Sequence, residues 1–486
     1  MSNEAKKSEF DKVLNMFDIL VIAFGAMIGW GWVVSSGSWI MSGGIVGAML
    51  GFAAGGVMIF FVGLTYAELT AAMPQSGGEH VFSFKAMGPL GSFICTWAII
   101  LGYVGVVCFE ACAFPTIIAY ILPSFNQFYL YSVAGFDIYA TWLVVGVVMS
   151  FLIMMINIKG AKKAAQLQTA LTVIIGGVGI VLIVASVVTG DIANVQTQVW
   201  SSDASVGIFK SILSVALVTP FFFLGFDVIP QAAEEINVPL KQVGKIMILS
   251  IVLAVSFYAL IILAVGLVMN VDMITESMNN GQALVTADAM AAAFNSAIMA
   301  KVLILGGLCG IVTSWNSFLI GGSRAMYSMA DACMIPRIFA KVHKTNKTPV
   351  TALWLIGILS MIAPFFGRQM LVWLVDAGNF GCCVAYCMVA ISFVILRYKE
   401  PDMPRPYVVK HFKFVGAAAI ILTFFMVMMY VIPNSGATLV AQEWIMVGGW
   451  IIIGVIFYIG CKMKYKEEFA SHVDVENEEL SQMKKN

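Results

Sequence analysis

The sequence predicts an all-α membrane protein with twelve transmembrane helices, of which the first and the sixth are broken. Of its 486 residues, 60% are hydrophobic and 11% are charged, whereas about a quarter of the residues of a soluble domain carry a charge. Apolar runs of about 18 residues or more, long enough to cross a bilayer as helices, recur along the whole chain. Glycine, aspartate and proline interrupt two of these runs.

The expected spans occupy most of the chain between two polar tails, 1–16 and 463–486. Several spans exceed the ~20 residues that a bilayer requires, which indicates tilted helices or cytoplasmic extensions. The first tail shows no cleavable signal peptide. The twelve spans are expected at 17–40, 44–72, 90–122, 138–157, 165–189, 207–233, 242–270, 300–330, 350–366, 370–396, 414–433 and 442–462.

The basic residues predict the orientation of the chain. With both tails placed in the cytoplasm, only Lys210, Lys301 and Arg368 of the 27 lysines and arginines fall on or near the outer side. Cytoplasmic loops of membrane proteins are enriched in lysine and arginine. We therefore expect a multi-pass protein of the cell membrane (plasma or inner membrane) with both termini in the cytoplasm.

The composition argues against several classes of function. The net charge is zero, so we expect no nucleic-acid partner. Most of the nine cysteines fall inside apolar runs and are interpreted as small hydrophobic residues between helices. No phosphate-binding GxxxxGK[ST] loop is present. We expect no enzyme, no catalytic residue, no cofactor and no haem, because the four histidines fall in expected loops or tails. These histidines are His80, His343, His411 and His472.

The first span is interrupted by the stretch GAMIGWG, residues 25–31, which holds three glycines in seven positions. Glycine in a helix interior costs about 1 kcal/mol relative to alanine, and irregular backbone at membrane depth persists only where it is buried in protein or lines a cavity. The sixth span has a matching interruption, FFFLGFDVIP, residues 221–230, which contains a glycine, an aspartate and a proline. Two interrupted spans in corresponding positions indicate a transporter substrate site. The alternative is that these glycines only let helices pack closely.

The two breaks would present backbone ends to a substrate. Backbone N–H groups of the first break would face a carboxylate, and carbonyl groups near the sixth-span break would accept an α-ammonium group. Such a clamp requires no charged side chain. Trp30 and Phe223, which flank the breaks, are candidates for an aromatic gate. The predicted substrate-binding residues are Ile28, Gly29, Trp30, Gly31, Phe223, Gly225, Asp227 and Asp376.

Three acidic residues, Glu110, Asp227 and Asp376, lie at membrane depth. A charge at the bilayer centre costs about 2.5–3.5 kcal/mol, so such residues are functional by default. Glu110 is a candidate for gating or coupling, or it pairs with Arg368. Asp227 is a candidate for coupling, or it caps the broken sixth helix. Asp376 lies eight residues, about 12 Å of helix, inward of Arg368, and is expected to line the cavity.

The eighth span carries hydroxyl groups at Thr313 and Ser314. With carbonyl groups of the first helix they could hold sodium, because hard cations take oxygen ligands. Ordinary hydrogen bonding between helices, worth about 0.6 kcal/mol for each bond, is the favoured alternative. No other metal site is predicted, and the coupling ion is left open between H⁺ and Na⁺.

Five stretches in this order resemble motifs of the amino acid–polyamine–organocation superfamily of permeases, and the resemblance covers residues 17 to about 410. They are GAMIGWGW (25–32), YAEL with MPQSGG (66–69 and 73–78), GFD with AEE (225–227 and 233–235), SRAMYSMA (323–330), and LRYKEP with RP (396–401 and 405–406).

This resemblance implies secondary active uptake or exchange of amino acids or amines by alternating access. It also implies a 5+5 inverted repeat, with residues 17–189 against 207–396 and two added helices in 414–462. The sequence departs from its relatives at three points. Trp30 replaces a small residue, Asp376 stands where serine is common, and the fifth span lacks the lysine that many relatives use for proton coupling.

The leading hypothesis is therefore a permease for an amino acid or a small organic amine. An exchanger for a polyamine or another amine is the first alternative. A transporter-like channel or sensor is less favoured, because broken helices around a closed midplane site indicate alternating access. The expected partners are the small-molecule substrate and membrane lipid. The oligomeric state is left open, with a homodimer as one option.

Overall fold

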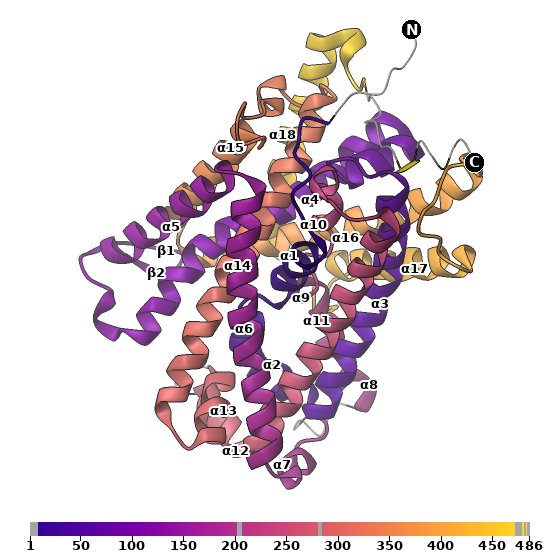
Figure 1. Ribbon diagram of the computed structural model, residues 1–486. Helices are drawn as coiled ribbons and strands as arrows, with labels where there is room; N and C mark the ends of the chain where they lie inside the picture. The colour runs from indigo at the N-terminus through magenta and orange to yellow at the C-terminus, as the bar shows by residue number, and fades with distance from the viewer. Residues whose placement is uncertain (1–7, 202–206, 280–283, 472–478, 481–482, 484–486) are drawn as a thin grey trace.

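The computed structural model is a bundle of long helices, with α7, α12 and α13 gathered at its lower end in Figure 1. It describes residues 8–201, 207–279, 284–471, 479–480 and 483. Within these residues, nine helical segments are long and apolar enough to cross a membrane, and the bent pair α1–α2 makes a tenth. The chain is thus a multi-pass membrane protein, as predicted.

The elements follow the expected spans closely, with additional short pieces between them. They are α1 (Met16–Ile28), α2 (Gly31–Gly43), α3 (Ile45–Ala72), α4 (Glu79–Ile121), β1 (Tyr129–Val133), β2 (Phe136–Tyr139), α5 (Ala140–Ile158), α6 (Ala161–Thr189), α7 (Ile192–Thr197), α8 (Ile208–Ala216), α9 (Thr219–Phe222), α10 (Val228–Gln231), α11 (Leu240–Val268), α12 (Val271–Asn279), α13 (Val285–Phe294), α14 (Ala297–Asp331), α15 (Val350–Ile362), α16 (Gly367–Lys399), α17 (Phe412–Val431) and α18 (Ala441–Tyr465).

The first span is broken inside the glycine-rich stretch, as predicted. Helix α1 begins at a capping box in which Asn15 Oδ1 accepts from the backbone N–H of Asp18, and the Asp18 carboxylate accepts from that of Asn15. It ends at Ile28, and α2 starts at Gly31 after a bend of 46°. Helix α1 lies among α6, α11 and α14. The break is therefore held inside protein, where irregular backbone is tolerated.

The sixth span is divided into α8, α9 and α10, none of which is long enough to cross a membrane alone. Gly225 between α9 and α10 has φ of +134°, and a Cβ atom there would lie 2.5 Å from the Cβ atom of Ala26. Glycine is required at this position for both reasons. The two breaks therefore meet, because Gly225 lies directly against α1.

Residues 350–399 form one helical stretch of 50 residues, where the sequence predicts two spans. A straight helix of this length would measure about 75 Å, more than twice the thickness of a bilayer core. The short 3₁₀ turn Ala363–Phe366 and Gly367, with φ of +72°, separate α15 from α16. The expected spans 350–366 and 370–396 therefore correspond to these two helices.

Three features differ from or extend the expectations. His80 was placed in a loop, but it is fully buried in α4, because the helix starts at Glu79 and passes a break at Gly88 before the third span. Strands β1 and β2 form an antiparallel hairpin in a connection for which no structure was predicted. Two short helices, α12 and α13, lie in the connection between the seventh and eighth expected spans.

Candidate substrate site

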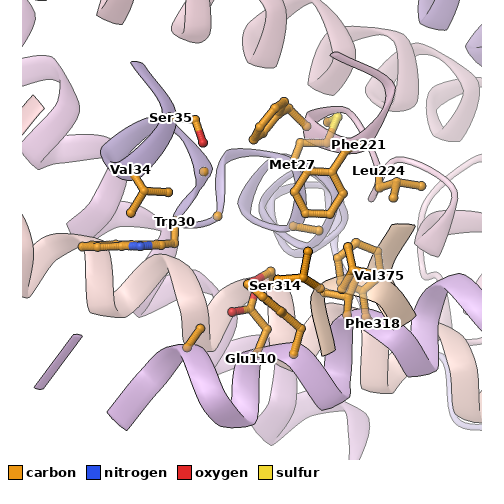
Figure 2. Close-up of a pocket in the computed structure, with 18 of the residues that line it drawn as sticks. Met27, Trp30, Val34, Ser35, Glu110, Phe221, Leu224, Ser314, Phe318 and Val375 are labelled. Carbon is orange, nitrogen blue, oxygen red and sulfur yellow. The ribbon is translucent and has the colours of Figure 1, made fainter. Parts of the chain in front are cut away.

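A cavity of about 260 Å³ lies at the break between α1 and α2. In Figure 2, Glu110 and Ser314 lie together at the bottom of the cavity, and Trp30 and Val34 lie at its left. Phe221 and Leu224 lie at the upper right, past Met27. Most of the lining is apolar. The polar and charged residues in it are Ser35, Glu110, Thr116, Tyr120, Tyr258, Ser314, Arg368 and Asp376.

Glu110 is the buried acid of this cavity, and its side chain is only 6% exposed. The Ser314 hydroxyl donates to Glu110 Oε1. The other carboxyl oxygen, Oε2, is buried and makes no hydrogen bond to any described residue. A buried acceptor without a donor is costly. The carboxyl group in this cavity wall therefore has one oxygen that is left without a donor among the described residues.

Arg368 and Asp376 of α16 line the same cavity. The sequence placed Arg368 at the outer edge, as a partner for Glu110; the hydrogen-bond partner of Glu110 is Ser314 instead. Asp376 faces the cavity as expected and is partly exposed. It also interacts with the carboxyl group of Glu443 at the start of α18. The charged lining therefore consists of two acids and one base.

The structure brings only some of the predicted site residues to the cavity. Gly29, Trp30, Gly31, Glu110, Ser314 and Asp376 line it, whereas Ile28, Phe223, Gly225, Asp227 and Thr313 do not. The Trp30 indole lies against Gly307 of α14, and Phe223 packs on Phe52 and Tyr258. Phe221, Phe222 and Leu224 take the cavity positions near the sixth-span break.

Asp227 lies at the break itself, fully buried and outside the cavity. Its Oδ1 atom accepts from the backbone N–H of Gly225 at 2.8 Å, and its Oδ2 atom accepts from the Tyr103 hydroxyl at 2.6 Å. Asp227 is the N-cap residue of α10, but its side chain does not cap that helix. One carboxylate oxygen therefore holds the broken backbone, and the other joins it to Tyr103 of α4.

One face of α4 was missed by the sequence analysis, although a signal was present. Counting from Glu110, the cavity residues Val106, Ala113, Ile117 and Tyr120 recur at helical spacing. Residues three, four, seven and ten positions apart share one face of a helix. The position of Glu110 in the sequence could therefore have predicted which face of α4 lines the cavity.

Comparison with known proteins gives the context of this site. The model of the amino acid permease family matches residues 14–457, nearly the whole chain. The chain belongs to the amino acid permease family. The permease is therefore a transporter and not an enzyme, and the resemblance to the amino acid–polyamine–organocation superfamily is confirmed.

Three relatives of Bacillus subtilis (strain 168) match over almost their whole length. A methylthioribose transporter is 27% identical over 465 residues, which cover 94% of this chain and 95% of the relative. A branched-chain amino acid permease is 25% identical, with 93% and 94% covered. An aspartate–proton symporter is 24% identical, with 94% and 92% covered. These names differ in the charge of the molecule carried.

Buried ion pairs join several segments of the permease. Arg324 of α14 pairs with Glu235 at 2.8 Å, and both side chains are 1% exposed. Glu68 of α3 meets Arg397 at 2.5 Å and Arg405 at 3.2 Å. These contacts all lie at helix ends that the charge pattern assigns to the cytoplasm.

The N-terminal segment adds a backbone contact to Glu235. The backbone N–H groups of Val13 and Leu14 donate to the Glu235 carbonyl group, each at 2.9 Å. Leu14 also accepts from the backbone N–H of Asn237 at 2.8 Å. The segment before α1 is thus joined to the segment after α10.

Where α6 faces α1, the permease uses neutral side chains. Gln168 Nε2 and the Thr172 hydroxyl both approach the Val21 carbonyl group, at 3.3 and 3.4 Å. The Thr313 hydroxyl donates to the Gly25 carbonyl group at 2.9 Å. These contacts are hydrogen bonds between helices, and a sodium site at Thr313 and Ser314 stays a prediction.

Proposed function

We propose that this permease carries an amino acid or small organic amine across the cell membrane by alternating access, with the substrate held in the cavity at the α1–α2 break. The observation that carries the proposal is the buried Oε2 atom of Glu110. An ammonium group has three donors and no acceptor, so it matches this atom. A charged hydrogen bond in a buried site is strong and directional.

The cavity also offers a place for the carboxylate group of a zwitterionic substrate. The N-terminus of α2 begins at Gly31 in the cavity wall, and the first N–H groups of a helix have no partner within the helix. They favour a carboxylate there. Arg368 adds a positive charge to the same lining. A molecule with both an amine and a carboxylate therefore finds an opposite charge for each.

The proposal includes twelve spans, with repeats at 17–189 and 207–396, added helices in 414–462 and both tails in the cytoplasm. Two features explain why twelve spans are proposed although only nine or ten long helices are found among the described residues. The pieces α8–α10 together replace one broken span, and Gly367 divides the 350–399 stretch into two. The excess of lysine and arginine on one side supports the orientation.

Alternating access is supported by the asymmetry of the contacts around the cavity. The buried pairs of Arg324 with Glu235 and of Glu68 with Arg397 close the side assigned to the cytoplasm. Arg368, which the sequence assigns to the outer side, lines the cavity. We infer an outward-facing conformation, and transport requires that these pairs open.

An amine exchanger is the second candidate, and one observation favours it. Asp376 lines both the central cavity and a neighbouring cavity of about 280 Å³ that also contains Glu443. The two carboxyl groups interact. Two adjacent carboxyl groups attract a cation, so a diamine could extend from Glu110 toward this pair.

Glu110→Gln should raise the apparent KM for amine substrates roughly 10- to 100-fold. The substitution keeps the size of the side chain but removes the charge, and a hydrogen bond to a charged group contributes about 1.5–3 kcal/mol. Uptake of labelled amino acids and amines into proteoliposomes measures the change. The exposed acid Glu276 on α12 provides the matched control, Glu276→Gln. An unchanged KM in Glu110→Gln would show that the substrate amine does not bind at Glu110.

Asp376→Ser should shift selectivity away from cations by about 1–2 kcal/mol, the value expected for a partly exposed charge pair. The resemblance to the superfamily implies a serine at this position. In competition assays, arginine, lysine and polyamines should lose about 5- to 30-fold against neutral amino acids. If glutamate or aspartate is the best substrate of the natural protein, the charge argument for both acids fails.

A further inference from the structure

A buried group of acids and tyrosines surrounds the sixth-span break outside the substrate cavity. We call it the acid–tyrosine cluster. Each of its side chains is at most 1% exposed, and none lines the cavity. The cluster consists of Tyr66, Glu79, Tyr103, Asp227, Gln231 and Tyr386.

Two carboxyl groups lie close together in this cluster. Gln231 Nε2 donates to Glu79 Oε2. Asp227 precedes Gln231 by four residues, and residues with this spacing lie about 6 Å apart on one face of a helix. The carboxyl groups of Glu79 and Asp227 therefore lie near enough to repel each other electrostatically when both are charged. The turn of Gly77 and Gly78 produces this arrangement, because Gly77 donates its N–H to the Gln231 carbonyl group at 3.3 Å.

No lysine or arginine offsets these two acids among the described residues. The nearby basic residues are already paired: Arg324 binds Glu235, and Arg397 and Arg405 bind Glu68. The titratable groups that face the pair are Tyr66 of α3, Tyr103 and Cys95 of α4, and Tyr386 and Cys382 of α16. His80, next to Glu79, has its Nδ1 atom 2.8 Å from the hydroxyl oxygen of Ser92.

Two buried carboxylates without a cation cannot both stay ionised at an acceptable cost. Asp227 is suited to carry the negative charge, because a backbone N–H and the Tyr103 hydroxyl both donate to it. Glu79 is suited to carry a proton. Its Oε1 atom is buried and makes no hydrogen bond of normal geometry to a described residue, although the Tyr66 hydroxyl lies near enough to this carboxyl group to interact with it. The carboxamide oxygen of Gln231 is likewise buried without such a bond to a described residue. A protonated Glu79 would supply a donor in this group.

We propose that Glu79 and Asp227 form a proton-binding site that couples transport to the proton gradient. The proposal rests on the transport function proposed above. In the outward-facing conformation Glu79 takes up one proton from the outer side, past Tyr103, which packs on the cavity residue Phe318. When the cytoplasmic side opens, the Glu79 carboxylic acid releases this proton to water and becomes a carboxylate. No electron moves, and no covalent bond other than the O–H bond changes.

The site is placed to act on the substrate cavity. Asp227 holds the backbone of Gly225, and Gly225 lies against Ala26 and Met27 of α1, both of which line the cavity. Loss of the proton adds a second negative charge beside Asp227. This repulsion acts on the residue that fixes the break, so the proton and the substrate influence the same piece of backbone.

The same site is also close to the cytoplasmic closure. The backbone N–H of Ser76 donates to Glu234 at 2.9 Å, and a Cβ atom on Gly78 would lie 2.7 Å from the Pro230 Cβ atom. Movement of α10 and residues 233–235 away from this turn would uncover Glu79. Opening of the Arg324–Glu235 pair, which belongs to the same segment, therefore gives the proton a route to the cytoplasm.

Glu79→Gln in proteoliposomes tests the proposal, with two measurements on each variant. Substrate exchange without a gradient reports transport itself, and uptake against an inward proton gradient reports coupling. One pH unit can support about tenfold accumulation for each proton moved. We expect the ratio of gradient-driven to gradient-free accumulation to be near this value in the natural protein and to fall to about one in Glu79→Gln. Glu276→Gln should keep the natural ratio.

A second variant and a second measurement distinguish loss of coupling from misfolding of Glu79→Gln. Glu79→Asp keeps a titratable group and should retain a ratio above that of Glu79→Gln. Infrared spectra of the purified natural protein should contain the carbonyl band of a buried carboxylic acid, and this band should be lost in Glu79→Gln.

A natural accumulation ratio in Glu79→Gln, with no change of the infrared band, overturns the proposal. Accumulation driven by sodium but not by protons overturns it as well. Absence of any exchange by the natural protein refutes the transport function, while the infrared band still decides whether Glu79 holds a proton.

Discussion

Gly31→Val should abolish uptake while leaving the protein inserted in the membrane. A Cβ atom at this position would lie 2.5 Å from Cε1 of Phe222, a distance that forces the ring to move. Phe222 has little room, because it packs on Trp39 with a centroid distance of 4.8 Å. The valine would therefore displace the start of α2 or fill the cavity where the substrate carboxylate is expected.

Gly448→Val provides a matched control for Gly31→Val. Gly448 lies in α18, and nothing approaches its Cβ position within 4 Å. The same change of residue type should leave uptake close to the natural value there. Expression, detergent-extracted yield and uptake of a labelled amino acid are compared for both variants. Normal uptake by a well-expressed Gly31→Val protein would contradict the placement of the substrate.

Glu235→Gln should destabilise the cytoplasmic closure by about 3–5 kcal/mol, the cost of removing one partner of a buried ion pair. It leaves Arg324 charged in a site where both side chains are 1% exposed. The Val13 and Leu14 backbone contacts to the Glu235 carbonyl group remain possible, so the loss is confined to the side-chain pair. Thermal unfolding in detergent and protection of the N-terminal segment from a protease measure the effect.

An exposed ion pair in the same protein provides the comparison for Glu235→Gln. Arg337 meets Glu468 at 2.7 Å, but these side chains are 57% and 61% exposed. Exposed pairs contribute about 0–1 kcal/mol, so Arg337→Gln should change the unfolding temperature little. Equal effects of Glu235→Gln and Arg337→Gln would show that the buried pair does not hold the closure.

The sequence was sufficient to predict the helical membrane fold and the broken first span. These features depend on local chemistry: the length of apolar runs, and the cost of glycine in a helix at membrane depth. The hairpin of β1 and β2 was not predicted, because its aromatic residues resemble those at the end of a span. The position of His80 was also wrong, because the start of α4 before Gly88 carries little hydropathy signal.

The candidate site could be predicted only in part. Glu110 was recognised as unusual, but its partner Ser314 is 204 residues away in the sequence. A contact between residues so far apart cannot be predicted from a single sequence. Asp227 was grouped with the cavity residues. The left-handed backbone at Gly225 and the facing hydroxyl of Tyr103 decide its position, and both depend on the tertiary packing of the break.

An experimental structure with the best transported substrate bound tests the central claim most directly. We expect the substrate in the cavity between Trp30 and Glu110, with its amine at hydrogen-bond distance, about 2.7–3.2 Å, from a Glu110 carboxyl oxygen. A carboxylate, where the substrate has one, should face the start of α2 at Gly31 or the guanidinium group of Arg368. Substrate bound elsewhere, with no polar group near Glu110, would contradict the account.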